Sequence, residues 1–589
     1  MCWMLQGKTG IEINQVKASD YIAQFLVERG VKTVFELSGG MITHMLDSFQ
    51  QRGSIRAVSM HHEQGAAFAA DGMGRMTGLP GVALATSGPG ATNLLTGIGS
   101  CYFDSSPAVF ITGQVNRHEQ KGDRAVRQLG FQETDIVSMA KPITKAAWQV
   151  RSVEELPQML AQAFALACDG RPGPVLVDIP MDIQRAELDE KLCHPAPATE
   201  PVEAIDAAVW VELLAHLARA KRPMILAGGG IRSGRAVELF RQFAAKLQIP
   251  VVHSLMGVDV LPWSDPLRVG MIGSYGNRWA NLALGKSDFL IVLGSRLDVR
   301  QTGSETKAFN SGKMIFHVDC DMAEINNRVT GCRAVVATVQ TFLRNALVAF
   351  NDQTFPRCTD WLQEIQNLRN QWPDVMELAN VPGINPNRFI HQLSKASPLA
   401  AAYVVDVGQH QMWAAQSIEP GEHQRFLTSG GMGSMGFSLP AAVGAATAVP
   451  GRPVVVIAGD GGFQCNIQEL ETIVRNKLPL KMVVINNHCH GMVRQFQESY
   501  FDKRYASTLW GYSAPDFTKV ATAYGIPART IRSEAEIPDA LKWFWADPAQ
   551  PCLLDVVVDT YTNAYPKIAF GHPITEMEPF ATPLEMEGT

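Results

Sequence analysis

The chain has 589 residues, of which 46% are hydrophobic and 18% charged, and its formal net charge is −6. This composition indicates a globular enzyme and excludes disordered and fibrous proteins, and the length predicts about three or four domains. The charge is mild and no apolar run approaches the ~20 residues of a membrane span, so we expect neither a nucleic-acid nor a membrane partner.

The first block of the chain, residues 15–190, alternates helix-like and strand-like segments. Its predicted elements are an amphipathic helix at 21–31, a strand running into a turn at 33–40, a strand and glycine turn that open a helix at 81–93, and strands at 107–115 and 174–180. Strands that alternate with helices indicate a doubly wound parallel sheet. A loop rich in Pro, Ala and Glu is expected to follow at 194–205.

The same alternation restarts twice. In the second block, residues 206–345, strands that end in turns are predicted at 222–232, 249–257, 288–298 and 314–321. A helical, Trp-containing stretch and a Pro-Gly-Asn segment then lead to the third block, residues 380–565. Its predicted features are strands at 401–411, 454–458, 482–486 and 552–559 and a glycine-rich turn and helix at 427–446. The fold class is therefore α/β, with three successive doubly wound parallel-sheet domains.

Polar residues follow two neighbouring strands of the third block. Asp460 lies between two glycines after strand 454–458, and Asn487 follows strand 482–486. In an open parallel sheet, ligands bind at the carboxyl ends of the strands. A carboxylate and an amide oxygen suit Mg²⁺, and flanking glycines allow a diphosphate to approach the backbone. The alternative is a β-turn with a capping aspartate and surface asparagines, because such short motifs often match by chance.

Other features of the chain bear on metals and location. His488, Cys489 and His490 stand in a row, but adjacent side chains cannot easily converge on one ion and no partner cluster has zinc spacing, so we expect no zinc site. Residues 1–15 lack the basic and then apolar plan of a signal peptide. Ten cysteines are scattered without CxxC pairs, which predicts reduced thiols and a cytoplasmic location.

The chain resembles a known family from about residue 17 to about 570. It is similar to the thiamine-diphosphate-dependent acetohydroxyacid synthase (acetolactate synthase) large subunits. The motifs that carry the resemblance, in chain order, are HHEQGAAFAADGMGRMTG, TSGPGATN, FQETDIV, RPGPVLVDIP, GDGGFQCNIQEL and NNHCHGMVRQFQ. The resemblance implies a pyrimidine-binding domain, a central FAD-binding domain and a diphosphate-binding domain. It further implies a homodimer or homotetramer in which each cofactor lies between the first domain of one subunit and the third of another, and it allows a small regulatory subunit.

The resemblance assigns Glu63 a catalytic role. Glu63 would hydrogen-bond the aminopyrimidine ring and favour the imino tautomer, so that the cofactor acts as its own base while the protein supplies orientation. Without the family motifs, Glu63 would instead be read as a solvent-facing helix residue, because Ala66, Ala67 and Ala69 follow on a helix-like run.

The thiamine-diphosphate site implied by the resemblance lies mainly in the third block. Asp460 and Asn487 would bind Mg²⁺ with the backbone carbonyl of Cys489. Met435 would wedge between the two cofactor rings, although most methionines are core residues. The other residues expected to contact this cofactor are Gln409, His410, Gln411, Gly433, Gly459, Gly461, Gly462 and Met492.

The central domain carries the features of relatives that hold FAD. They are glycine turns at strand ends followed by arginines, which backbone approach to a diphosphate requires. The residues expected to bind FAD are Arg171, Gly228, Gly229, Gly230, Arg232, Leu255, Met256, Gly273, Gly276, Gly294, Arg296, Asp298, Arg300, Asp319 and Asp321. The resemblance implies that this FAD is mostly structural, because the carboligation has no net redox step.

Substrate residues are implied in all three domains. Phe131 and Gln132 would line the donor pocket, and Arg300 would hold an acceptor carboxylate or the flavin. Two positions depart from the family: Phe496 replaces the usual tryptophan and Met181 replaces a lysine. A phenyl ring in place of an indole enlarges a pocket and removes an N–H donor, so the acceptor can differ from 2-ketobutyrate or pyruvate.

These expectations give one leading function and two alternatives. The leading function is a transferase that decarboxylates pyruvate and joins the two-carbon unit to a second 2-ketoacid, giving 2-acetolactate. An alternative keeps this donor but uses an aldehyde, ketone or keto-sugar as acceptor. The third reading is a catalytically silent regulatory paralogue, against which the intact Glu63, Asp460 and Asn487 argue.

Overall fold

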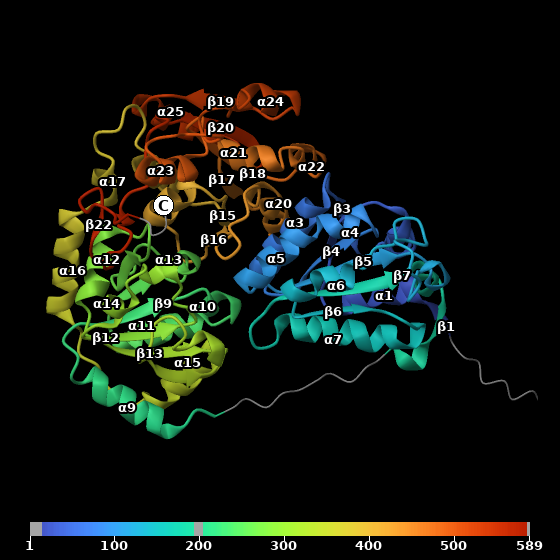
Figure 1. Ribbon diagram of the computed structural model, residues 1–589, viewed down its shortest axis with the longest axis horizontal. Coiled ribbons are helices and arrows are strands. Elements are labelled where there is room, and N and C mark those ends of the chain that lie inside the picture. The colour runs from blue at the N-terminus through green and yellow to red at the C-terminus, as the bar shows by residue number, and fades with distance from the viewer. Residues whose placement is uncertain (1–14, 194–203, 586–589) are drawn as a thin grey trace, which may run out of the picture.

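The protein is built around three six-stranded parallel sheets, each with helices on both faces (Figure 1). The computed structural model describes residues 15–193 and 204–585. Residues 1–14 and most of the predicted loop 194–205 therefore lie outside the described residues. The prediction of three successive doubly wound α/β domains is confirmed.

The first sheet has the strand order β3-β2-β4-β5-β7-β6. Its strands are β2 (Thr33–Leu37), β3 (Arg56–Ser59), β4 (Gly81–Ala85), β5 (Ala108–Gln114), β6 (Ala146–Gln149) and β7 (Pro174–Pro180). The helices of this domain are α1 (Ala18–Glu28), α2 (Thr43–Arg52), α3 (Glu63–Thr77), α4 (Pro89–Asn93), α5 (Leu95–Asp104), α6 (Ile136–Ala140), α7 (Leu156–Cys168) and α8 (Met181–Gln184). A short antiparallel pair, β1 (Gln15–Lys17) with β8 (Glu187–Asp189), closes it.

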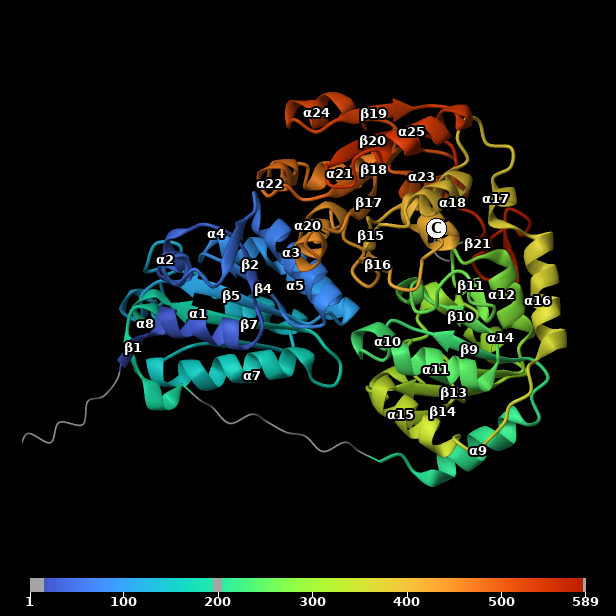
Figure 2. The same cartoon turned by 180° about the vertical axis from the view of Figure 1, so that it is seen from behind.

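The middle sheet has the order β11-β10-β9-β12-β13-β14. Its strands are β9 (Pro223–Ala227), β10 (Val251–His253), β11 (Arg268–Met271), β12 (Phe289–Leu293), β13 (Met314–Asp319) and β14 (Arg333–Val336). Its helices are α9 (Ala207–Leu217), α10 (Gly230–Ser233), α11 (Val237–Leu247), α12 (Arg278–Lys286), α13 (Val299–Thr302), α14 (Thr306–Asn310) and α15 (Val339–Ala349). Helices α16 (Thr359–Gln371) and α17 (Asp374–Glu377) then run along the side of the molecule toward the third sheet (Figure 2).

The third sheet has the order β16-β15-β17-β18-β20-β19. Its strands are β15 (Ala402–Val405), β16 (Arg425–Thr428), β17 (Val454–Gly459), β18 (Leu480–Asn486), β19 (Ala528–Ile531) and β20 (Cys552–Val557). Its helices are α18 (Pro386–Ala396), α19 (Gln409–Ser417), α20 (Ser438–Ala448), α21 (Asp460–Cys465), α22 (Glu469–Arg475), α23 (Gly491–Tyr500), α24 (Phe517–Ala523) and α25 (Ile537–Phe544). The chain then returns to the middle domain, where β21 (Lys567–Ile568) pairs with β22 (Met577–Glu578).

The central strands are buried on both faces, which explains their sequences. All seven residues of β5 and all seven of β18 are buried. Strands covered by helices on both sides lose the alternation of polar and apolar residues and become continuous apolar runs. Within the described part of the chain, no helix is long and apolar enough to cross a bilayer.

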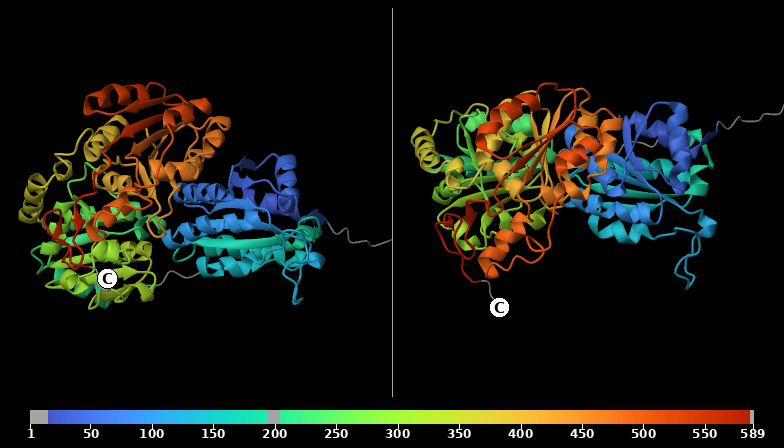
Figure 3. Two further views of the ribbon diagram at one scale, coloured as in Figure 1. Left: turned by 45° about the horizontal axis from the view of Figure 1, so that its top comes forward. Right: turned by 90° about the horizontal axis from the view of Figure 1, so that it is seen from above.

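The first and third domains meet where α3 packs against α20 (Figures 1 and 3). The two helices approach closely because small residues face each other. A Cβ atom on Gly72 would lie 2.1 Å from the Ala441 carbonyl oxygen, and one on Gly444 would lie 1.9 Å from that of Ala69. Helix α3 begins at Glu63, so this contact sets where that residue, predicted to be catalytic, lies relative to the third sheet.

Candidate active site

The GDG turn and Asn487 lie side by side at the carboxyl edge of the third sheet. Strands β17 and β18 are neighbours, with Gly459 opposite Ile485. Asp460 follows β17 directly and opens α21, and Asn487 follows the last residue of β18. Both side chains are buried. The topology therefore brings the two predicted metal ligands to one edge.

Asp460 has a donor in place that the motif did not reveal. The Tyr512 hydroxyl donates to Asp460 Oδ2 over 2.9 Å. Burial raises the pKa of Asp460 to about 7. No ion pair to Asp460 is found among residues 15–193 and 204–585, and a buried carboxylate without one is a group that a divalent ion would stabilise. One carboxylate and one amide oxygen fit the donor set of Mg²⁺, which completes its octahedron with waters and phosphate oxygens.

The glycines around Asp460 form a cradle that side chains would fill. A Cβ atom on Gly459 would lie 2.7 Å from His410 Nδ1, and one on Gly461 would lie 2.8 Å from the His490 ring. On Gly462 it would meet Asp406 Oδ1 at 2.5 Å. The turn packs this closely against its neighbours only because Cβ atoms are missing, and glycines at these positions also fit the close approach of a diphosphate to the backbone.

The segment Gln409–Gln411 opens α19 next to this cradle, and all three side chains are buried. The Gly459 N–H donates to His410 Nε2 over 3.1 Å, and burial lowers the pKa of His410 to about 3, so the imidazole is neutral. Asn487 Nδ2 donates to Gln409 Oε1 over 3.1 Å. Gln411 Nε2 donates to Thr428 Oγ1 over 2.7 Å. These bonds connect the two strand ends with the start of the glycine loop.

The glycine loop, residues 429–437, carries Met435 and Gly433. Met435 is exposed, and its Cε lies 3.3 Å from the position of a Cβ on Gly461, so it reaches the GDG turn. Gly433 has φ +68°, which favours glycine. Asp406 at the end of β15 accepts the backbone N–H groups of Gly436 and Ser438, both over 2.9 Å. The loop is thereby held beside the cradle.

Met492 and Cys489 complete the predicted set in this domain. Met492 lies on α23 and packs against the hydrophobic core on one face of the third sheet. Cys489 is buried, and its backbone N–H donates to Asn487 Oδ1 over 3.2 Å. This bond turns the chain back toward Asn487, which places the Cys489 backbone next to the predicted metal ligands.

Glu63 lies in the first domain, at the first position of α3. Its side chain is 6% exposed, and Oε2 accepts from Asn93 Nδ2 over 3.0 Å. A Cβ on Gly90 would lie 3.1 Å from Glu63 Oε1, so the TSGPGATN turn leaves room for the carboxylate. Among the described residues, no hydrogen bond or ion pair joins Glu63 to Met435 or Asp460 of the same chain.

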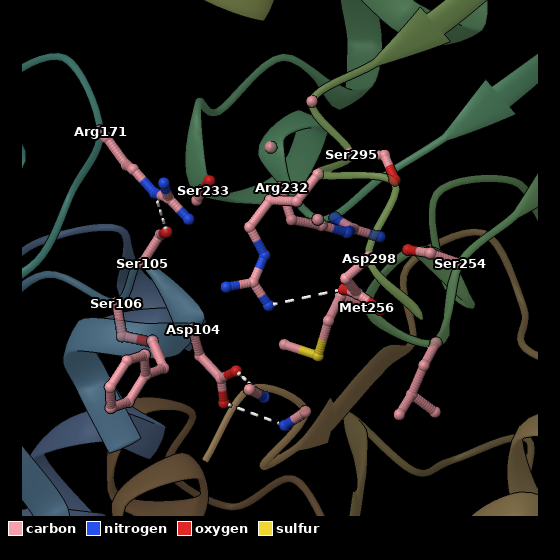
Figure 4. Close-up of a pocket in the computed structure, with 18 of the residues that line it drawn as sticks. Asp104, Ser105, Ser106, Arg171, Arg232, Ser233, Ser254, Met256, Ser295 and Asp298 are labelled. Atoms are coloured by element: carbon pink, nitrogen blue, oxygen red, sulfur yellow. Dashed lines mark hydrogen bonds and ion pairs between the residues drawn. The ribbon is translucent and has the colours of Figure 1, made fainter. Parts of the chain in front are cut away.

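A cavity of about 760 Å³ lies between the three domains (Figure 4). Its volume is typical of ligand pockets, which span about 300–1,000 Å³. Figure 4 shows Arg171, Arg232 and Met256 turned toward this space. The predicted FAD residues that line it are Arg171, Gly229, Gly230, Arg232, Leu255, Met256, Gly294, Arg296, Asp298, Arg300 and Asp319. Gln411 and Gly433, predicted for thiamine diphosphate, also line it. A cavity walled by strand-end glycine turns and arginines fits FAD.

Four of the predicted FAD residues do not line the cavity: Gly228, Gly273, Gly276 and Asp321. The three glycines allow close backbone packing around it. A Cβ on Gly228 would lie 2.1 Å from the Gly294 carbonyl oxygen, and one on Gly273, with φ +113°, 2.4 Å from that of Arg300. Gly276 closes a turn on Gly273. Asp321 instead pairs with Arg171 at 3.8 Å.

The predicted substrate residues are spread over the chain. Arg300 is exposed at the cavity. Phe131 is 79% exposed, and Gln132 has φ +66°, a backbone conformation that is rare outside glycine. Met181 opens α8 at the end of β7, and Phe496 lies on α23 at 38% exposure. These last four residues do not line the cavity.

Sequence reasoning missed three residues that hold the site together. Tyr512 donates to Asp460, and Asp104 accepts the N–H groups of Gly430 and Gly431 over 3.1 and 2.6 Å, as Figure 4 shows. Glu469 contacts the chain just before Glu63. Only Glu469 had a local signal, since it stands in GDGGFQCNIQEL. Tyr512 and Asp104 act across loops and domains, which spacing alone does not reveal.

Known proteins match the chain over almost its whole length. Three family models match: the thiamine pyrophosphate enzyme N-terminal TPP binding domain at residues 16–139, the central domain at 211–346 and the C-terminal TPP binding domain at 406–556. Acetolactate synthase isozyme 2 large subunit of Escherichia coli (strain K12) is 39% identical over 95% of this chain and 99% of that protein. The acetolactate synthase large subunit of Lactococcus lactis is 36% identical over 95% of both, and a probable one of Methanocaldococcus jannaschii is 38% identical over 95% of both. This chain therefore belongs to the acetolactate synthase large-subunit family of thiamine pyrophosphate enzymes.

Proposed function

We propose that the chain is an acetolactate synthase that releases carbon dioxide from pyruvate and joins the remaining two-carbon unit to a second 2-ketoacid. The proposal rests above all on one observation: relatives named acetolactate synthase match 95% of the chain at 36–39% identity. The buried pair Asp460 and Asn487 and the buried Glu63 supply the chemistry residues that a silent paralogue would lack.

The family uses thiamine diphosphate, Mg²⁺ and FAD. Thiamine diphosphate supplies a carbon nucleophile that takes up the donor and stabilises negative charge after decarboxylation. Asp460, Asn487 and the Cys489 carbonyl would hold Mg²⁺ against the diphosphate in the glycine cradle. Glu63 would hold a proton at the pyrimidine ring, and Met435 would orient the two rings. The cavity between the domains would hold FAD.

We propose that two copies of the chain complete each site. Glu63 bonds to Asn93 of its own domain and not to the cradle of its own chain. Beside Gln132, the side chains of Val126, Leu129 and Phe131 are 45%, 48% and 79% exposed, a cluster that a second copy would cover. A homodimer or homotetramer, a small regulatory subunit, a cytoplasmic location and the domain limits 15–190, 206–345 and 380–565 belong to the same proposal.

A second acceptor class is supported by one feature of α23. The Phe496 ring lies 4.9 Å from Tyr500 and 5.7 Å from Phe501, and Tyr500 lies 6.5 Å from Phe570 of the C-terminal segment. These four rings form an aromatic wall, of which Phe496, Phe501 and Phe570 are 38–42% exposed. With Met181 in place of a lysine, an uncharged aldehyde or ketone acceptor would meet no cation at that position.

One assay separates these functions. The purified protein is loaded with thiamine diphosphate, Mg²⁺ and FAD and given pyruvate alone, then pyruvate with an aldehyde, a ketone or a keto-sugar. Acetolactate as the main product supports the leading function. Carbon dioxide with only acetaldehyde would show a simple decarboxylase, and no carbon dioxide at all would support the silent paralogue. Preferential consumption of a non-acidic acceptor would support the second class.

A further inference from the structure

The segment that follows Asp460 reaches across the domain boundary to the start of α3. Asn466, between α21 and α22, donates from Nδ2 to Gln64 Oε1 over 3.2 Å and to the Gly436 carbonyl over 2.8 Å. Three residues later, Glu469 Oε1 accepts the His61 backbone N–H over 3.0 Å. The two contacts are made on either side of Glu63, at His61 and at Gln64.

Glu469 makes this contact from a fully buried position, with both carboxylate oxygens hydrogen-bonded. Its side chain has no exposed surface, and Oε2 accepts from Thr472 Oγ1 over 2.6 Å. A Cβ on Gly65 would lie 2.7 Å from Glu469 Oε1, so this glycine makes room for the carboxylate. A buried carboxylate is costly unless donors surround it, and the free N–H groups at a helix start favour negative charge. The His61 N–H, just before α3, and the Thr472 hydroxyl together meet that need.

We propose that Glu469 is a positioning residue for Glu63, which holds the backbone at His61 so that the Glu63 carboxylate faces the Asn93 and Gly90 side of its pocket. The proposal rests on the proposed role of Glu63 at the pyrimidine ring. His62 is the N-cap of α3 and accepts the Gln64 N–H on Nδ1 over 3.0 Å. The start of α3 is therefore held by two groups. The His62 side chain caps the helix within the first domain, and Glu469 of the third domain holds the backbone at His61.

This assignment connects the metal site with the proton-holding residue of the same chain. Asp460, Asn466 and Glu469 belong to one short segment. Asn466 hydrogen-bonds Gln64 of α3, and Glu469 accepts the His61 N–H just before the helix. The segment after Asp460 is therefore joined to the residues on both sides of Glu63 by two hydrogen bonds. If each site is shared between two copies, Glu469 ties the metal site of one cofactor to the Glu63 that serves the other.

The test measures the exchange of the C2 proton of bound thiamine diphosphate for deuterium, which needs no substrate turnover. The full-length protein is loaded with thiamine diphosphate, Mg²⁺ and FAD, and exchange is quenched and read by NMR. We expect E469Q to slow exchange about tenfold, the size of one hydrogen bond to a charged group, because the amide cannot accept on both sides. Cofactor affinity and the Michaelis constant for pyruvate should stay within about twofold of wild type, since Glu469 contacts neither ligand in the proposed site.

Three further variants make the outcome decisive. E471Q makes the same charge change on the same helix and should exchange like wild type. Gly65→Ala keeps the carboxylate but presses a methyl group against it, and should slow exchange as E469Q does even if E469Q folds poorly. E63Q gives the slowest exchange rate that loss of the Glu63 carboxylate can produce. If E63Q slows exchange while E469Q and Gly65→Ala do not, the positioning role is refuted. If E63Q also exchanges like wild type, the role of Glu63 fails and the positioning proposal falls with it.

Discussion

Replacing Gly444 with alanine tests the contact between α3 and α20. A Cβ atom there would lie 1.9 Å from the Ala69 carbonyl oxygen, whereas real Cβ atoms essentially never come within 3.0 Å of a neighbour. The obstacle is backbone, which cannot rotate away as a long side chain would. The two helices must therefore separate by about 1.1 Å, or α20 must shift along its length.

The change in the free energy of unfolding follows from two opposed effects. Alanine favours a helix over glycine by about 1 kcal/mol. Overpacking a close interface costs roughly 1–3 kcal/mol, and more where only backbone can move. We expect a net loss of up to about 2 kcal/mol, which for domains of this size lowers Tm by roughly 4–8 °C. Glu63 moves with α3, so carbon dioxide release should fall more than the loss of folded protein explains.

Thermal unfolding and pyruvate decarboxylation should be measured on Gly444→Ala with Gly421→Ala as control. Gly421 is exposed, and a Cβ there would meet the Gln424 side chain at ordinary distances of 3.4 Å or more. The control should unfold and react like wild type. A Gly444→Ala protein with wild-type or higher Tm would show that the helices are not held at this distance, and the argument from the reciprocal glycines would be wrong.

Three further predictions concern charged groups. Burial alone lowers the pKa of His391, but Asp374 and Glu419, at 2.9 and 2.7 Å, outweigh it and raise the pKa to about 9. The protonated His391 therefore adds its full stabilisation to the folded protein below about pH 6.5, and this contribution is lost as pH rises through 9. The difference in Tm between wild type and His391→Gln should accordingly vanish by pH 10, and a constant difference would contradict the prediction. Asp104→Asn should speed amide hydrogen exchange in the glycine loop, and unchanged rates there would contradict its bracing role. Asp460→Ala should weaken thiamine-diphosphate binding about 100-fold with flavin absorbance retained, whereas equal affinity would remove Asp460 from the metal site.

The sequence predicts the four central strands of each six-stranded sheet, but not its two edge strands or the two short antiparallel pairs β1-β8 and β21-β22. Apolar runs predicted β2, β4, β5 and β7 in the first sheet and the corresponding inner strands in the other two. The unpredicted edge strands are β3, β6, β11, β14, β16 and β19. Edge strands such as β3 (RAVS) and β6 (AAWQ) are short and partly exposed, so they lack the continuous apolar run that burial on both faces produces.

The candidate site was predictable where its residues are close in sequence. The GDG turn and Asn487 flank two adjacent strands, so parallel pairing alone brings them to one edge. The position of Glu63 depends instead on how α3 meets α20 and α22, which no local pattern encodes. Asp104 is similar: its partners Gly430 and Gly431 lie more than three hundred residues away in the chain.

A network of charges, largely buried, runs through the place where all three domains meet. Arg75 of α3 pairs with Asp71 at 2.6 Å and Asp104 at 2.9 Å, while Asp259 of the middle domain pairs with Arg232 at 2.9 Å and Arg425 at 3.0 Å. The two groups are joined because Arg425 donates to the Arg75 carbonyl over 2.7 Å.

Such a network is a poor way to gain stability, because desolvating the charges cancels much of their attraction, and apolar side chains could fill the same space. Apolar side chains could not, however, bind the polar backbone at this junction. Arg75 donates to the Thr428 carbonyl over 2.8 Å, and Asp104 accepts the next N–H groups of the glycine loop. The charges therefore determine the orientation of the glycine loop more than they stabilise the fold. They orient the loop that carries Met435 from the first domain and tie it, through Asp259 and Arg232, to the wall of the cavity proposed for FAD.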